Sequence, residues 1–128
     1  MANKTLTIIE TAYRATLEEQ DDTVVWIHTA MKGAGGDFTV LLRGNAVNYA
    51  VKAQKTPALN FGEWRQKNPA DIPGDVQRLA GKGVEIFVVE EDVAARGLER
   101  TDLLENVKSV NRAGIARMVE QHDRVWYW

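Results

Sequence analysis

The chain has 128 residues, of which 45% are hydrophobic and 27% are charged, as expected for one globular domain spanning residues 1–128. Its formal net charge of -2 gives no electrostatic reason to expect a nucleic acid or an anionic membrane as a partner. It contains no cysteine, which excludes disulfides, thiolate catalysis and every cysteine-ligated metal site.

The first half of the chain alternates strand-like and helix-like segments. Residues 5–9 and 38–42 are rich in apolar and β-branched side chains, which predicts two strands. Between them, apolar residues at helical spacing predict a helix from residue 17 to about residue 34. Its apolar face consists of Val24, Ile27, His28 and Met31. The second strand is followed by a predicted short helix, whose apolar side consists of Val47, Ala50 and Val51.

Residues 52–71 interrupt this alternation with two prolines, a glycine and several polar residues. Connections longer than about 12–15 residues without regular structure are usually functional or disordered. The segment carries Phe61 and Trp64, so we predict that it forms a lid or a subunit contact. The alternative is that both rings pack against the chain's own domain and only hold the loop in place.

The second half contains the stretch on which the predicted site depends. A helix with Pro73 in its first turn leads to residues 84–89, an apolar run that predicts a strand buried on both faces within the sheet. Three carboxylates follow this strand. A short helical turn is then expected to stop at Gly97, because glycine tolerates a positive φ.

The remaining predicted elements are short. Residues 101–105 are predicted to form a helix with Thr101 as its N-cap, and residues 107–110 a brief strand. Asn111 is expected to cap a last helix. The alternation of strands with helices predicts a mainly parallel sheet with helices on both faces.

The chain finishes in a β-rich segment, residues 123–128, in which Trp126 and Trp128 alternate with Tyr127. Alternation in a strand places both indoles on the same side. They could fill the edge of the core or lie in a subunit interface, and we favour the interface because aromatic residues are enriched there.

Five segments of the chain keep the order and spacing found in a known family. They read Lys-Thr-Leu-Thr-Ile-Ile-Glu-Thr, Thr-Val-Leu-Leu-Arg-Gly-Asn-Ala-Val, Gly-Val-Glu-Ile-Phe-Val-Val, Ala-Arg-Gly-Leu and Asp-Arg-Val. In these segments the chain resembles the DsrE/DsrF-like family, small proteins of sulfur relay and intracellular sulfur oxidation. The resemblance extends over nearly the full length.

This resemblance implies a three-layer α/β/α sandwich with a mainly parallel five-stranded sheet, commonly assembled into trimers or hexamers. Active members of the family carry sulfur as a persulfide on a cysteine eight residues before the glycine that is Gly97 in this chain. Some members have a second cysteine, five residues before that glycine. Val89 and Asp92 occupy these two positions here, so the family's catalytic role does not carry over.

We predict a site where the carboxyl ends of three strands meet, because open α/β sheets bind ligands at that edge. The candidate ligand-binding residues are Glu10, Tyr13, Arg43, Asn45, Val89, Glu90, Glu91 and Arg96. The two arginines could bind an anion, or they could neutralise the three glutamates in an internal network, which is the favoured interpretation. Acid–base catalysis by Glu90 and Glu91 is disfavoured, because adjacent residues leaving a strand point to opposite sides.

Two functions remain open. The first is a cysteine-free, non-catalytic homo-oligomer of the DsrE/DsrF type, which binds a small ligand or a sulfur-carrier protein partner in the cytoplasm. The second is a small enzyme of another class that acts on an anionic substrate through glutamate and arginine groups at the sheet edge. We expect no cofactor and no metal site, because His28 and His122 lie on apolar helical faces, where a satisfied, half-buried histidine is the commoner finding. No apolar run approaches the roughly 18 residues of a membrane span.

Overall fold

The computed structural model describes residues 3–13 and 22–128. Its main sheet has five strands in the order β6-β5-β2-β1-β7, and all neighbouring strands run parallel. The strands are β1 (Thr5–Ile9), β2 (Phe38–Leu42), β5 (Ile86–Val89), β6 (Lys108–Val110) and β7 (Arg124–Tyr127). The central strand is β2, and β5 lies inside the sheet between β2 and β6, as the apolar run predicted.

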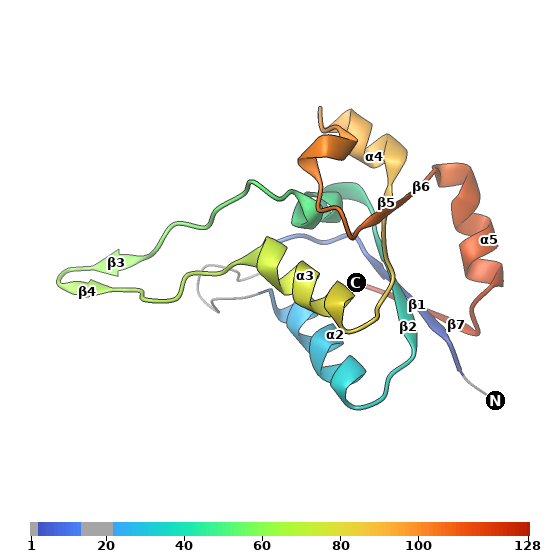
Figure 1. Ribbon diagram of the computed structural model, residues 1–128, viewed down its shortest axis with the longest axis horizontal. Helices are drawn as coiled ribbons and strands as arrows, with labels where there is room; N and C mark the ends of the chain where they lie inside the picture. Colours follow the sequence, from blue (N-terminus) through green and yellow to red (C-terminus); the bar gives the residue numbers. More distant parts are fainter. Residues whose placement is uncertain (1–2, 14–21) are drawn as a thin grey trace.

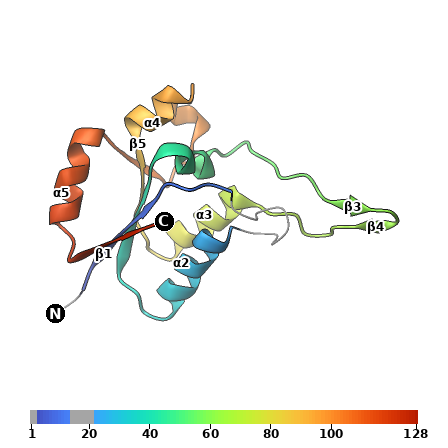
Figure 2. The same cartoon turned by 180° about the vertical axis from the view of Figure 1, so that it is seen from behind.

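Helices cover both faces of this sheet (Figure 1 and Figure 2). The helices α2 (Thr23–Gly33) and α3 (Ile72–Gly81) pack on one face, and α5 (Ile115–Glu120) packs on the other. The 3-10 helix η1 (Gly44–Ala50) and helix α4 (Glu90–Ala95) follow the carboxyl ends of β2 and β5. The larger core cluster joins the sheet to α2 and α3, and a smaller one lies under α5. The predicted α/β/α sandwich is therefore confirmed.

Helices α2 and α3 begin at aspartates whose side chains cap them. The Asp22 carboxylate accepts hydrogen bonds from the backbone N–H groups of Val24 and Val25, at 3.0 and 3.1 Å, and so caps α2. The helix predicted for residues 17–34 is therefore observed from residue 23, and residues 17–21 lie outside the described residues. Helix α3 carries its proline in the first turn, as predicted.

One predicted helix is wrong in position and in type. Residues 101–105 do not form an α-helix, and Thr101 is not an N-cap. A single 3-10 turn, η2 (Arg100–Asp102), takes their place. The backbone N–H of Glu99 donates to the Asp102 carboxylate at 2.8 Å, which fixes the turn two residues earlier than predicted. The predicted cap at Asn111 is confirmed, where a second 3-10 turn, η3 (Arg112–Gly114), leads into α5.

Residues 52–71, called the arm below, extend away from the body of the domain (Figure 1 and Figure 2). The tip is a two-stranded antiparallel hairpin of β3 (Asn60–Phe61) and β4 (Trp64–Arg65). The Phe61 and Trp64 rings lie 5.8 Å apart and are 66% and 56% exposed. The two rings therefore do not pin the arm to the body of its own domain, which was the alternative interpretation.

The tail forms β7, the edge strand next to β1. The centroid of the Trp128 ring lies 5.6 Å from that of the buried His28 on α2, and Trp126, Tyr127 and Trp128 are all exposed. The subunit interface favoured for this tail stays a prediction. Within residues 3–13 and 22–128, no helix has both the length and the apolar character needed to cross a lipid bilayer.

Candidate functional site

The carboxyl ends of β1, β2 and β5 lie side by side, because these strands are parallel and adjacent in the sheet. Glu10, Arg43 and Glu90 are the first residues after the three strands. The backbone N–H of Arg43 donates to the carbonyl of Ile9 at 3.0 Å, so the parallel ladder continues to this edge. The predicted convergence of three strand ends is therefore present, but the side chains at this edge divide into separate groups.

The first group joins η1 to α4. Both Nε and Nη2 of Arg96 donate to Asn45 Oδ1, at 3.2 and 2.7 Å, and Nη1 donates to the Asp92 carbonyl at 3.0 Å. The Asp92 carboxylate accepts from the backbone N–H of Gly44 at 2.8 Å. Arg96 therefore belongs to an internal network, as the favoured interpretation held, but its partners are Asn45 and Asp92 and not the predicted glutamates.

The same network reaches η3, the turn before α5, through Arg112, which the sequence analysis did not single out. The Arg112 guanidinium lies 3.1 Å from Asp92 Oδ1, and its backbone N–H donates to Glu91 Oε1 at 2.8 Å. Glu91 thus caps the turn before α5, whereas Glu90 is not part of this network. No local periodicity could have identified Arg112, because this contact spans 20 residues and two elements.

The second group lies at the β1 edge. The Tyr127 hydroxyl, from the far end of the chain, donates to the Glu10 carboxylate. This hydrogen bond raises the pKa of Tyr127, and the nearby Arg43 opposes the rise. Glu10 also lies directly over Gly44, since a Cβ there would meet the Glu10 Cγ at 3.1 Å. The Glu10 carboxylate is therefore already hydrogen-bonded to Tyr127 of the neighbouring strand β7.

The third group surrounds Tyr13, whose backbone φ of 59° is one that residues other than glycine rarely adopt. Its backbone N–H donates to the Tyr49 hydroxyl at 2.6 Å, and its own hydroxyl donates to Gln54 Oε1 at 2.5 Å. The buried Tyr49 hydroxyl donates in turn to the buried Asp22 carboxylate. Burial, and next this hydrogen bond to Asp22, raise the pKa of Tyr49. The strained turn after β1 is therefore held by a buried tyrosine–aspartate pair that the sequence analysis missed.

Val89 lies at the end of β5, directly before α4, which is the place that the resemblance assigns to a sulfur-bearing cysteine. Its side chain is completely buried in the smaller core cluster with Leu41 and Met118. Val89 is therefore part of the core, and Glu90 is the first exposed residue after β5.

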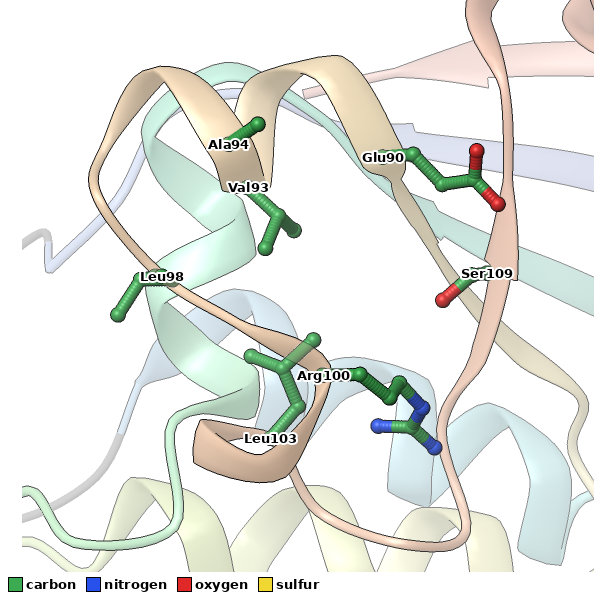
Figure 3. Close-up of a pocket in the computed structure, with 7 residues that line it drawn as sticks. All are labelled: Glu90, Val93, Ala94, Leu98, Arg100, Leu103 and Ser109. Atoms are coloured by element: carbon green, nitrogen blue, oxygen red, sulfur yellow. The ribbon is translucent and has the colours of Figure 1, made fainter.

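A cavity of about 340 Å³ opens beside α4 (Figure 3). Its lining consists of Glu90, Val93, Ala94, Leu98, Arg100, Leu103 and Ser109. The guanidinium of Arg100 is fixed by the carbonyls of Leu104 and Val107, to which it donates. Figure 3 shows the Glu90 carboxylate and the Ser109 hydroxyl on one side of the opening and Arg100 below them. Of the predicted site residues, only Glu90 lines this cavity.

Both histidines are held in structural positions. His28 is buried with Nδ1 at 2.7 Å from the Val24 carbonyl, and burial lowers its pKa. His122 places Nε2 at 3.0 Å from the Thr39 hydroxyl. Among residues 3–13 and 22–128, no three metal-ligating side chains come together in a cluster that could hold an ion.

Comparisons with known proteins support the fold and one part of the family resemblance. The family model described as "DsrH like protein" matches residues 72–125, which include β5, α4 and the cavity. No curated protein matches the chain in sequence.

Three solved structures share the fold. The ychN protein from E. coli aligns with a TM-score of 0.72 at 16% identity, over 100% of both chains. A protein of unknown function from Methanobacterium thermoautotrophicum aligns with a TM-score of 0.65 at 16% identity, over 97% of this chain and 98% of that one. A conserved protein of unknown function from Bacteroides thetaiotaomicron aligns at 0.66 and 12% identity, over 97% and 94%. The chain therefore has the fold of the ychN protein, and its residues 72–125 match the DsrH-like family model.

Proposed function

We propose that this chain is a non-catalytic subunit of a sulfur-relay type system. It binds a small sulfur-containing ligand, or the persulfide-bearing segment of a carrier protein, in the cavity beside α4. The observation that carries the proposal is the end of β5, where a buried Val89 stands at the place of the sulfur-bearing cysteine and the cavity begins one residue later at Glu90. The DsrH-like match over the same segment supports it.

The lining of the cavity favours binding over chemistry. It offers one carboxylate, one guanidinium and one hydroxyl against apolar walls, and neither a thiol nor a histidine. Such a set can orient a ligand whose anionic end accepts from the N–H groups of Arg100 that its carbonyl contacts leave over, and whose hydrogen-bond donor lies near Glu90. Nucleophilic use of the Ser109 hydroxyl would need a base that activates it, and the cavity lining has no histidine for that role. The alternative of an enzyme acting through the predicted glutamates and arginines finds less support, since Glu10, Glu91 and Arg96 already bond to other parts of the chain.

The proposal includes assembly into a trimer or hexamer in the cytoplasm. Exposed aromatic side chains support a subunit contact, since contiguous apolar surface on a small domain commonly marks an interaction site. They gather at the tip of the arm and along β7, where Tyr127 is 55% exposed.

A thermal-shift series tests the binding function. The probes are thiosulfate, glutathione persulfide, adenosine monophosphate and citrate, each with the full chain. A ligand at about 100 times its Kd stabilises the folded state by about 2.7 kcal/mol, which for a domain of this size raises Tm by roughly 10 °C. We expect a rise with the sulfur compounds and none with the other two.

The matched variants are Ala94→Trp, which fills the cavity, and Ala95→Trp on the same exposed helix outside it. The first should abolish the shift and the second should retain it. A shift that appears only with citrate or the nucleotide, or one that survives Ala94→Trp, would refute the proposed function.

A further inference from the structure

The arm presents an aromatic tip that its own domain leaves open. Phe61 and Trp64 face each other across a two-residue turn, with their rings 5.8 Å apart. An isolated two-stranded hairpin is only marginally stable in water. Two large exposed aromatic side chains at its end are typical of the anchors that dominate protein interfaces. The arm therefore has the properties of a segment that is completed by another surface.

The charge of the arm limits which surface that is. Residues 55–67 contain three basic side chains and one acidic side chain, a net charge of +2 in a chain whose total is -2. Residues 90–105, which form α4, η2 and most of the cavity wall, contain six acidic and two basic side chains, a net charge of -4. The two segments are thus electrostatically complementary.

The cavity beside α4 also has a size and a lining that suit an aromatic side chain. Its volume of about 340 Å³ lies within the range of pockets that accept small molecules, about 300–1,000 Å³. Its walls include Val93 and Leu103, and Glu90 stands at one side. An aromatic ring from outside would find apolar contact there, beside the Glu90 carboxylate.

The arm and α4 leave the body of the domain in different directions (Figure 1 and Figure 2). The tip of an arm therefore meets the cavity of another copy more directly than its own. We propose that the arm of one copy closes the cavity beside α4 of a second copy, with Trp64 and Phe61 over its mouth. The contact is head-to-tail, and repeating it gives a closed ring if the rotation between neighbouring copies closes. Each ligand site is then completed by an aromatic tip from the neighbouring copy.

This inference rests on the homo-oligomer in the proposed function, and engineered cysteines test it in the full chain. The natural chain has no cysteine, so an introduced pair is the only thiol pair present. Glu63→Cys lies at the tip of the arm, Ala94→Cys lies in the cavity wall, and Ala95→Cys is the matched control on the same helix. Under mild oxidation, a mixture of the first two should give a mixed disulfide dimer in at least tenfold excess over the mixture with the control.

Light scattering gives the second readout. We expect a mass of at least twice 14.3 kDa for the natural protein and the mass of a single chain for the double variant Phe61→Ala with Trp64→Ala. Each aromatic truncation alone should weaken association by about 30-fold or more, as for other interface anchors. Trp26→Ala, which removes an equally exposed indole on α2, should leave the mass unchanged.

Three results would overturn the inference. The first is a monomer at all concentrations. The second is an oligomer that keeps its mass in the double variant and shows no selective disulfide, which leaves the proposed ligand binding to be judged by its own thermal-shift series. The third is tight binding of single-stranded DNA that is lost in Trp64→Ala, since aromatic tips with basic flanks also stack on bases.

Discussion

Tyr49→Phe is the substitution that tests most sharply how the strained turn after β1 is held. The Tyr49 side chain is completely buried and its hydroxyl makes two contacts. It donates to the Asp22 carboxylate, and it accepts from the backbone N–H of Tyr13 at 2.6 Å. Phenylalanine keeps the ring and its edge-to-face contact with Tyr13, whose centroid lies 5.0 Å away, but removes both hydrogen bonds.

The expected loss of stability depends on the hydrogen bonds that Asp22 and Tyr13 keep after the substitution. A hydrogen bond to a charged group contributes about 1.5–3 kcal/mol, and a buried carboxylate that loses one donor is not compensated by water. Asp22 keeps two backbone donors, those of Val24 and Val25, so it is not left wholly unpaired. The N–H of Tyr13 is only partly buried and can bind water. We therefore expect Tyr49→Phe to lower the free energy of unfolding by about 2–3 kcal/mol.

Urea unfolding followed by circular dichroism measures this loss. Tyr13→Phe is the control, since it removes only the exposed contact of the Tyr13 hydroxyl with Gln54 and should cost less than about 1 kcal/mol. A double-mutant cycle with Asp22→Asn should show that Tyr49 and Asp22 are coupled. A loss of under about 0.5 kcal/mol for Tyr49→Phe would refute the reasoning.

Three further predictions concern other parts of the molecule. Burial lowers the folded-state pKa of His28, so the unfolded chain binds more protons and the free energy of unfolding should fall as pH drops below about 6.5, by at most about 1.4 kcal/mol per pH unit. Urea midpoints measured across this range should depend less steeply on pH in His28→Leu than in the natural chain. An equal dependence on pH in both would contradict this role of His28. Gly97→Ala should cost about 1 kcal/mol in chemical unfolding, since φ is +70° and no atom crowds the added Cβ, whereas Gly81→Ala, in open space at the end of α3, should be neutral or stabilising. Val89→Cys should resist a thiol reagent in the native chain and react in denaturant, because its side chain is completely buried; rapid native labelling would show that the sheet edge opens.

The sheet was predictable because its strands are continuous apolar runs. Residues 5–9 and 38–42 match β1 and β2 without any shift, and their full burial explains why both faces read as apolar. The proline at the start of α3 and the asparagine before η3 act on the adjacent backbone, so the helix starts that they predict are observed. Short elements were less predictable. The hairpin β3–β4 has two residues in each strand, too few for any period to appear.

The sequence predicted which strand ends meet, but not which side chains pair there. Parallel topology alone brings Glu10, Arg43 and Glu90 to one edge, and the sequence pattern carries that information. Which side chains then pair depends on contacts from distant segments, such as Tyr127 with Glu10 across 117 residues. Local periodicity does not predict such contacts, so only the structure shows that the side chains at this edge form three separate groups.

The proposed binding role is tested most directly by calorimetric titration of the chain with freshly prepared glutathione persulfide, with glutathione as the reference ligand. We expect one saturable binding heat per chain for the persulfide, and none in Ala94→Trp, because that indole fills the cavity beside α4. The heat should return to baseline after each injection, since the chain has no thiol to accept the sulfur. A persistent heat flow, which indicates turnover, or the absence of any saturable heat would contradict this account.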